Sequence, residues 1–271
     1  GAKAAPKGGG GGRRGGGAAA AAAAERALWT QRAWAMLAGL CVLRLALNAL
    51  GLIPVHFDEA QYWAYGREMA AGHYSKPPLV GWLILASTSL LGDTAFALRF
   101  FAPLAHLAVG AGVFLVGRRL FDARTGFWAA LLYSAAPGVS ISAGLMTTDP
   151  VMMAGWVLAL YALVRAMEVQ PGPKTAEPWG WWVLMGVGVG LGMLAKYTAV
   201  ALPLGLLGYV IFSRETPITP SRRRGAALAA GAALLVLSPN LVWNARHGFV
   251  TVTHLGENAE VGRGGLVHPG E

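Results

Sequence analysis

The chain has 271 residues, of which 55% are hydrophobic and only 13% are charged, and its formal net charge is +9. A soluble domain carries about 25% charged residues, so this composition excludes an ordinary soluble protein. It indicates an integral membrane protein, and the fold class that we expect is all-α, a polytopic transmembrane helical bundle. The single cysteine, Cys41, excludes an internal disulfide.

The first predicted region covers residues 1–33. Residues 1–24 are a low-complexity stretch of glycine and alanine with a few basic residues. Such a composition cannot bury an apolar core, so we expect a disordered, cytoplasmic N-terminus.

The second predicted region, residues 34–243, is expected to form the transmembrane catalytic domain. About 20 consecutive apolar residues cross a hydrocarbon core, and segments of nearly this length recur throughout the region. The seven predicted spans are Trp34–Val55, Ala97–Gly117, Gly126–Met146, Pro150–Met167, Trp179–Ala195, Tyr197–Ser213 and Gly225–Trp243. Another apolar stretch, Pro77–Leu91, is shorter and opens with two prolines, which indicates an interfacial or re-entrant helix.

The basic residues predict the orientation of these spans. With a cytoplasmic N-terminus, most of the 22 basic residues, including Arg118, Arg119 and residues 222–224, lie on the inner side. This asymmetry follows the positive-inside rule. The net charge therefore reflects membrane orientation, and a nucleic-acid partner need not be invoked. Residues 244–271 are expected to form an outer loop that continues into a further C-terminal part.

The segment that follows the first span carries two adjacent acids, Asp58 and Glu59. Its composition is compatible with a juxtamembrane helix, and Tyr62 is a residue type that favours the headgroup level. Asp58 could simply cap this helix, because its carboxylate would accept backbone N–H groups. The alternative is that both acids are catalytic and that Tyr62 contributes to the substrate site.

Further charged residues return to the same predicted side of the membrane. Asp149 precedes Pro150, an arrangement typical of a helix start, so it is either an N-cap or a functional acid. Lys196 is either a lysine that extends to the headgroups or a substrate ligand. Arg99 is expected to pair with Asp93 or to attract a phosphate.

Two other sets of side chains receive a structural interpretation. Arg44, in the middle of a predicted span, is expected to bind a neighbouring helix or a carbonyl. The histidines on the outer side show no metal-site spacing with another His or Cys, so no metal ligand is predicted.

These residues gather on one face of the membrane. Ionisable residues where helices leave the lipid usually mark a site for chemistry or ion movement. The set comprises Asp58, Glu59, Lys76, Asp149 and Lys196.

Several motifs in this order resemble glycosyltransferase family 39, which includes the protein O-mannosyltransferases and the lipid A aminoarabinose transferases. The resemblance covers residues 34–256. The matching motifs are Asp58-Glu59-Ala60-Gln61-Tyr62-Trp63, Gly72-His73-Tyr74-Ser75-Lys76-Pro77-Pro78-Leu79, Leu98-Arg99-Phe100, Gly117-Arg118-Arg119-Leu120-Phe121-Asp122, Thr148-Asp149, Ala195-Lys196-Tyr197 and Trp243-Asn244-Ala245-Arg246-His247-Gly248.

The resemblance implies a type C glycosyltransferase architecture with two juxtamembrane helices in the first outer loop. It also implies a sugar donor carried on a polyprenyl or dolichyl phosphate. Asp58 matches the catalytic aspartate of the family, Glu59 its neighbour, and Asp149 the second acid, while Lys76 matches the lysine of the loop motif. The aminoarabinose transferases carry an acid directly before that lysine, where this chain has Ser75, so a divalent cation and a lipid A acceptor do not follow from the resemblance.

The predicted reaction is a single displacement with inversion at the anomeric carbon. Asp58 would take the proton of the acceptor hydroxyl. Lys76, Lys196 or Arg99 would stabilise the departing lipid phosphate, and Glu59 or Asp149 would orient the acceptor or the sugar.

The acceptor is left open between protein, lipid and glycan. The long glycine and alanine runs are typical of a GC-rich bacterial gene, which points to the inner membrane with a periplasmic active face. The alternatives are a polytopic transporter that uses the acids and lysines for ion coupling, and a structural subunit in which the acids only cap helices.

Overall fold

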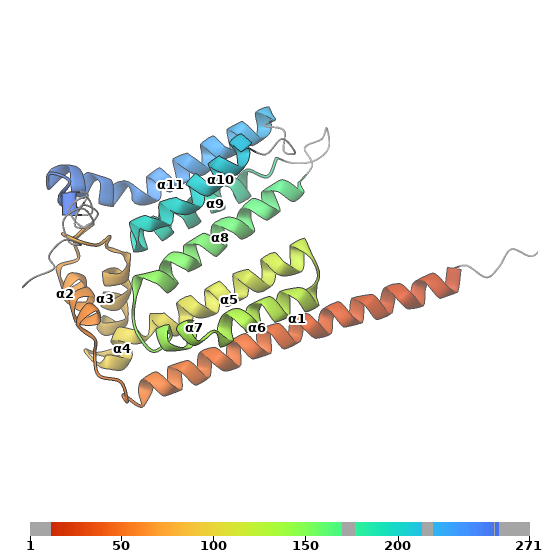
Figure 1. Ribbon diagram of the computed structural model, residues 1–271, viewed down its shortest axis with the longest axis horizontal. Helices are drawn as coiled ribbons and strands as arrows, with labels where there is room; N and C mark the ends of the chain where they lie inside the picture. Colours follow the sequence, from red (N-terminus) through yellow and green to blue (C-terminus); the bar gives the residue numbers. More distant parts are fainter. Residues whose placement is uncertain (1–11, 170–176, 213–218, 252, 255–271) are drawn as a thin grey trace, which may run out of the picture.

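A computed structural model describes residues 12–169, 177–212, 219–251 and 253–254. The described residues form helices and no strand, as the predicted fold class requires. Figure 1 shows the long helices lying side by side, with three short ones gathered at one end. The helices are α1 (Gly12–Ala49), α2 (Phe57–Glu68), α3 (Leu79–Leu91), α4 (Ala95–Arg99), α5 (Phe101–Leu120), α6 (Ala123–Ala135), α7 (Pro137–Ser142), α8 (Thr148–Glu168), α9 (Trp179–Ala195), the 3-10 turn η1 (Tyr197–Val200), α10 (Ala201–Phe212) and α11 (Pro220–Arg246).

Four of these helical segments are long and apolar enough to cross a membrane, where seven spans were predicted. They are Gly17–Ala49, Ala95–Leu120, Thr148–Glu168 and Pro220–Arg246. The apolar segments Trp179–Ala195 and Tyr197–Tyr209 are shorter, and so is Leu79–Leu91.

The predicted third span, Gly126–Met146, is wrong as a single helix. Helix α6 ends at Ala135, and Pro137 opens α7, which has only six residues. The residue before a proline is pushed away from helical geometry, and Ala136 accordingly has φ −58° and ψ 133°. The proline therefore ends one helix and starts another.

Helix α1 begins at Gly12, well before the predicted start at Trp34. Alanine has the highest intrinsic helix propensity, so the alanine run continues the first span rather than interrupting it. Residues 1–11 lie outside the described residues. Within the span, Arg44 donates a hydrogen bond from Nη2 to the carbonyl of Ser134 at 2.7 Å, which confirms that this arginine binds a neighbouring helix.

Helices α8 and α9 run side by side in opposite directions and approach closely through glycines (Figure 1). A Cβ atom added to Gly155 would lie 2.6 Å from the carbonyl oxygen of Gly188, and one added to Gly188 would lie 2.7 Å from that of Gly155. Only glycine permits this approach. The first turn of α8, with Asp149, is thereby brought beside Lys196, which follows the last residue of α9.

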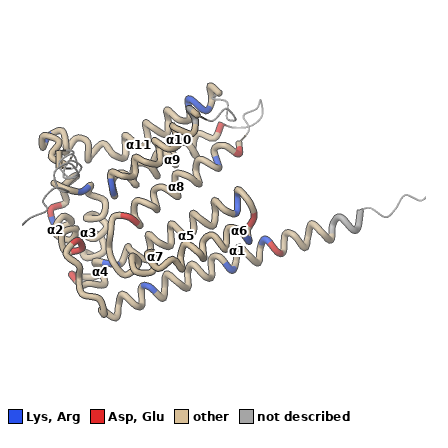
Figure 2. Tube along the Cα trace, viewed as in Figure 1, with Lys and Arg blue, Asp and Glu red and all other residues tan. Residues whose placement is uncertain are grey.

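Charged residues gather at two ends of the bundle and are sparse between them (Figure 2). One end holds α2, α3 and α4, and we call it the α2–α4 end. The other holds the turn between α5 and α6, and we call it the opposite end. Helix α3 has 13 residues, too few for a crossing, and packs against α2, where a Cβ atom on Gly66 would lie 2.6 Å from the carbonyl oxygen of Gly81.

Candidate active site

Helix α2 starts with a capping box that does not use Asp58. The N-cap is His56, whose ring Nδ1 accepts the N–H of Asp58 at 3.4 Å. Glu59 completes the box, because its Oε2 accepts the N–H of His56 at 2.9 Å. The alternative in which Asp58 caps the helix is therefore wrong, and its carboxylate is available for another role.

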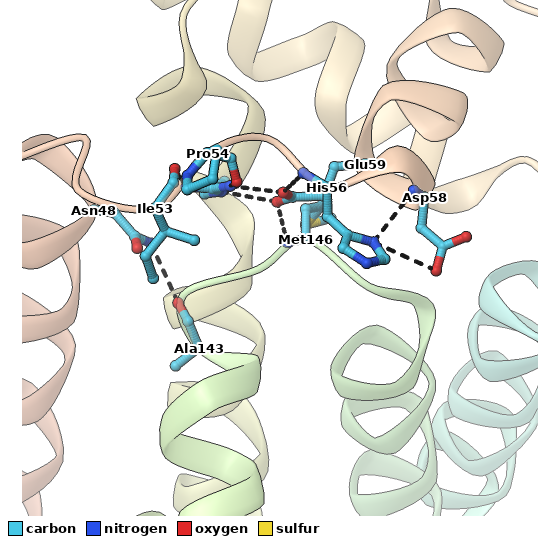
Figure 3. Close-up of polar contacts among 9 residues, drawn as sticks. Asn48, Ile53, Pro54, His56, Asp58, Glu59, Ala143 and Met146 are labelled. Carbon is cyan, nitrogen blue, oxygen red and sulfur yellow. Dashed lines mark hydrogen bonds and ion pairs between the residues drawn. The ribbon is translucent and has the colours of Figure 1, made fainter.

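Glu59 forms a bidentate salt bridge with Arg99 of α4. The guanidinium Nε donates to Oε1 at 2.8 Å and Nη2 donates to Oε2 at 2.7 Å, and both side chains are 1% exposed. Arg99 also donates to the carbonyls of Ile53 and Pro54, each at 2.8 Å (Figure 3). The pair thus joins α2, α4 and the segment that follows α1.

Glu59 also anchors the segment that leads into α8. Its Oε1 accepts the N–H of Met146 at 2.8 Å. Burial raises the pKa of the Glu59 carboxyl, but hydrogen bonds from Arg99, His56 and Met146 outweigh that effect and hold the pKa below its usual value. A buried carboxylate with four donors around it has no free edge for a substrate, which favours a positioning role for Glu59 over the catalytic role predicted from the sequence.

Arg99 is equally enclosed, which argues against its predicted contact with a phosphate. Its predicted alternative partner, Asp93, instead binds two residues of α2. Asp93 accepts hydrogen bonds from Trp63 Nε1 at 3.1 Å and from Arg67 Nη1 at 2.8 Å. The predicted pairing of Arg99 with Asp93 is therefore wrong.

Asp58 is the acid of this segment that remains accessible. Its side chain is 42% exposed, and His56 Nδ1 lies 3.9 Å from its Oδ2. Among the described residues, no hydrogen bond to this carboxylate is formed. Figure 3 shows that Asp58 points away from the cluster around Glu59. One residue of the acid pair is thus enclosed and its neighbour is open.

Tyr62 lies one turn further along α2 and connects Asp58 with α8. Its side chain is buried, and burial, followed by the negative charges of Asp58 and Asp149, raises its pKa to about 12. A side-chain hydrogen bond with Thr148 acts in the opposite direction. The Tyr62 hydroxyl is therefore protonated at neutral pH and lies near both acids.

Asp149 and Lys196 form the second ion pair of the α2–α4 end. Lys196 Nζ donates to Asp149 Oδ1 at 2.7 Å, and the side chains are 33% and 53% exposed. The N-cap of α8 is Thr147, so the alternative in which Asp149 caps the helix is wrong. Lys196, for its part, binds an acid rather than extending freely to the headgroups.

Lys76 belongs to the connection between α2 and α3. Its side chain is partly buried, and within the described part of the chain its ammonium group has no carboxylate partner. The hydroxyl of the preceding Ser75 lies 3.1 Å from that of Tyr65, and His73 stacks on the Tyr65 ring at 4.1 Å. This connection is therefore ordered around a lysine whose charge is free for a ligand.

A set of polar residues that was given no role from the sequence holds the two lysine-bearing segments together. Asn240 is buried and donates to the carbonyl of Ala71 at 2.9 Å. It accepts from the hydroxyl of Tyr197, next to Lys196, at 2.7 Å. Asn244 donates to that hydroxyl at 3.2 Å. The only signal in the sequence was that Tyr197 and Asn244 belong to the motifs of the resemblance.

The described residues contain no group of three or more His, Cys, Asp or Glu side chains arranged to hold a metal ion. Of the accessible carboxylates at the α2–α4 end, Asp149 is bound to Lys196 and Asp93 to Arg67, while Asp58 and Glu68 lie near the opposite ends of α2. This set does not fit a divalent cation, and no step of the reaction below is assigned to one.

The family model described as dolichyl-phosphate-mannose-protein mannosyltransferase matches residues 75–243, more than half of the chain. The chain belongs to this mannosyltransferase family. That finding confirms the resemblance to glycosyltransferase family 39 and does not support the transporter alternative.

Members of the mannosyltransferase family among curated proteins give the same result. The lipid A galacturonosyltransferase RgtD of Rhizobium johnstonii is 30% identical over 218 residues, which cover 80% of this chain and 44% of that protein. An undecaprenyl phosphate-alpha-4-amino-4-deoxy-L-arabinose arabinosyl transferase of Pseudomonas aeruginosa is 31% identical over 181 residues, 65% of this chain and 32% of that protein. The chain thus spans less than half the length of these relatives.

Solved structures of the family show the same fold. ArnT from Cupriavidus metallidurans in the apo state matches with a TM-score of 0.63 at 22% identity, over 90% of this chain and 44% of that chain. The Saccharomyces cerevisiae Pmt1-Pmt2 complex matches with a TM-score of 0.56 at 18% identity, over 81% of this chain and 34% of that chain. The chain is therefore an integral membrane protein with the fold of these membrane glycosyltransferases.

Proposed function

We propose that this protein is a membrane glycosyltransferase that moves a sugar from a polyprenyl-phosphate donor to an acceptor hydroxyl. The observation that carries the proposal is the arrangement around Tyr62. Tyr62 lies near the accessible Asp58 and near Asp149 of the Lys196–Asp149 pair, at one end of a bundle of apolar helices. An accessible acid, a cation and a scaffold of apolar helices are what transfer from a lipid phosphate requires.

In this mechanism Asp58 is the general base. It would accept the proton of the acceptor hydroxyl as that oxygen attacks the anomeric carbon. A single displacement of this kind forms the new C–O bond and breaks the bond to the lipid phosphate, with inversion at that carbon. Asp58 suits this role because its carboxylate is open, whereas that of Glu59 is enclosed.

The departing lipid phosphate gains negative charge, which fixed cations stabilise strongly in a partly dehydrated site. Lys196 and Lys76 are the candidates, because both side chains are partly exposed at the α2–α4 end. Asp149 would hold the Lys196 ammonium in place until the phosphate competes for it. Asp149, Tyr62 and Lys76 are accordingly proposed to contact the donor or the acceptor.

The relatives support a lipid-linked donor. The Pseudomonas protein is named for an undecaprenyl-phosphate sugar, and the Cupriavidus ArnT structure was also solved bound to undecaprenyl phosphate. We propose the same class of donor here, with a lipid, protein or glycan acceptor. The proposed location is the bacterial inner membrane, with the α2–α4 end facing the periplasm, since the arginine clusters lie at the opposite end (Figure 2).

The test is transfer from a radiolabelled polyprenyl-phosphate sugar in membranes that contain the protein. Replacing Asp58 by Asn keeps the shape of the side chain and removes the base, so the rate of transfer should fall by roughly 10²–10⁴-fold. The matched control is Glu68→Gln, a second carboxylate of α2 that is 70% exposed. Transfer at the same rate in D58N and the parent protein would exclude Asp58 as the base, and uptake of the sugar without transfer would favour a transporter.

A further inference from the structure

A polar cavity of about 660 Å³ lies at the opposite end of the bundle. Figure 1 shows that the turn between α5 and α6, which contributes to it, is far along the helices from the α2–α4 end. It is an open hollow lined by α1, the last turn of α5, the turn into α6 and the end of α8. The side chains that give it its character are Arg26, Trp29, Arg118, Arg119, Asp122 and Arg124.

Of the four arginines that line this cavity, one forms a salt bridge among the described residues and three do not. Within the part of the chain that the structure describes, Arg26, Arg118 and Arg124 form no ion pair with a carboxylate. Arg119 lies 3.2 Å from Glu168, which is shared with Arg165 at the same distance. The guanidinium groups therefore outnumber the carboxylates that could neutralise them.

The acids at the cavity do not supply that neutralisation. The carboxylate of Asp122 caps α6, because its Oδ1 accepts the N–H of Thr125 at 2.7 Å. This hydrogen bond holds the pKa of Asp122 below its usual value. The positive charge of Arg124 contributes to this lowering, but the two side chains form no salt bridge. Glu168 is occupied as described above, and Glu25 on α1 is exposed to solvent. An anion that enters the cavity would meet the guanidinium groups of Arg26, Arg118 and Arg124, none of which is held in a salt bridge among the described residues.

The cavity also has an aromatic wall. The Trp29 ring packs on Phe127 with centroids 5.3 Å apart, and the Arg124 guanidinium lies 5.7 Å from the Trp29 centroid. Along α1 from this point, Leu28 and Trp34 are exposed apolar side chains. Exposed apolar side chains of α1 thus lie near the polar cavity in the sequence of the helix, as an amphipathic ligand requires.

We propose that this cavity binds the phosphate of an anionic phospholipid of the adjoining leaflet, with its acyl chains along the exposed face of α1. The recognised chemistry is a phosphate oxyanion held by Arg118, Arg124 and Arg26. A membrane lipid is favoured over free phosphate as the source, because basic pockets between membrane helices bind anionic headgroups and because the apolar face beside this cavity would be used only by a lipid.

The experiment is native mass spectrometry of the whole protein, titrated separately with phosphatidylglycerol, phosphatidylcholine and inorganic phosphate. The parent protein should retain phosphatidylglycerol in preference to phosphatidylcholine. Arg118→Gln with Arg124→Gln should lower the affinity for phosphatidylglycerol roughly 30-fold, since each arginine near a membrane surface contributes about fivefold. The single variant Arg26→Gln, at an exposed position of α1, should lower it about fivefold and tests the proposal if the double variant does not fold.

The matched control is Arg223→Gln with Arg224→Gln, which removes the same charge from the opposite end but outside this cavity. It should leave retention unchanged. An equal loss in both double variants would mean general charge attraction and would overturn the proposal. So would retention of phosphatidylcholine as strong as that of phosphatidylglycerol, or binding of inorganic phosphate as tight as that of the lipid.

Discussion

Two ion pairs at the α2–α4 end are made from the same chemistry in opposite surroundings. Glu59 and Arg99 are each 1% exposed, and backbone groups complete their hydrogen bonding. Asp149 and Lys196 are 53% and 33% exposed and share a single contact of 2.7 Å. The first pair has no surface for a ligand, while the second can exchange its partner.

This difference in exposure separates a structural role from a role in the reaction. A buried charge is costly unless every part of it is bound, so the Glu59–Arg99 pair must stay closed to remain stable. An exposed pair contributes little to stability, so it can open for a substrate at small cost. The enclosed pair therefore fixes the segments that carry Asp58 and Asp149, and the open pair is the one expected to meet the donor.

Breaking the enclosed pair should have the largest effect on stability. Arg99→Ala leaves the Glu59 carboxylate buried without its partner, which should lower the free energy of unfolding by about 3–5 kcal/mol. Arg99→Lys should rescue little of this, because an ammonium cannot replace the bidentate guanidinium. The measurement is the thermal midpoint of the detergent-solubilised protein. A midpoint equal to that of the parent would contradict the supporting role.

Breaking the open pair should affect the reaction instead. Lys196→Ala should change the free energy of unfolding by less than about 1 kcal/mol. It should lower the rate of transfer by roughly 10²–10³-fold, because a cation at the departing phosphate is lost. Transfer from a labelled donor and thermal unfolding, measured on one preparation, check both statements. A large loss of stability with the transfer rate unchanged would reverse the roles of the two pairs.

Lowering the pH should weaken the Glu59–Arg99 pair gradually. Because the pKa of Glu59 in the folded state lies below its ordinary value of 4.5, its contribution is fully present above pH 4.5 and is lost as the pH falls through the folded-state pKa. Thermal midpoints from pH 7 downward should therefore decline below pH 4.5. Glu59→Gln should be less stable at neutral pH and should show a weaker decline. An identical pH profile in the two proteins would contradict the assignment.

The smallest effect is expected for a third pair, Arg67 and Asp93, which lies on the same end without a proposed role. The two side chains are 57% and 50% exposed, with Nη1 and Oδ2 2.8 Å apart. Asp93→Asn should leave both the thermal midpoint and the rate of transfer near those of the parent protein, because an exposed ion pair contributes little to stability. It serves as the control for surface charge, and a loss of transfer comparable to that in Lys196→Ala would mean that exposure alone does not identify the site.

Much of the fold could be predicted from the lengths of the apolar segments and from the positions of the prolines. Residues Trp179–Ala195 and Leu79–Leu91 appear with nearly the predicted bounds, because prolines precede both helices and no internal proline interrupts them. The prediction of a single helix across Pro137 was wrong for a physical reason. Hydropathy measures only the free energy of transfer from water to an apolar phase, and it does not register that proline lacks a backbone N–H.

The site was predictable as a set but not in its pairings. Charge and topology placed Asp58, Asp149 and Lys196 at one end, which the structure reproduces. The partner of Arg99 could not be foreseen, because Glu59 is 40 residues away along the chain and competes with the nearer Asp93. Nor could pattern alone decide which acid of the Asp58–Glu59 pair is enclosed, since that depends on how α2 turns against α4.

The glycine contact between α8 and α9 has a consequence for how the protein could diversify. Because Gly155 and Gly188 allow the two helix backbones to approach closely, the distance between Asp149 and Lys196 is set partly by positions within α8 and α9 that are six or more residues away from the two charges. Exchanging one of these hydrogens for a methyl group would act as a wedge between α8 and α9 and move Asp149 relative to Lys196. The distance between Asp149 and Lys196 could thus be adjusted to donors of different size without a substitution at either residue.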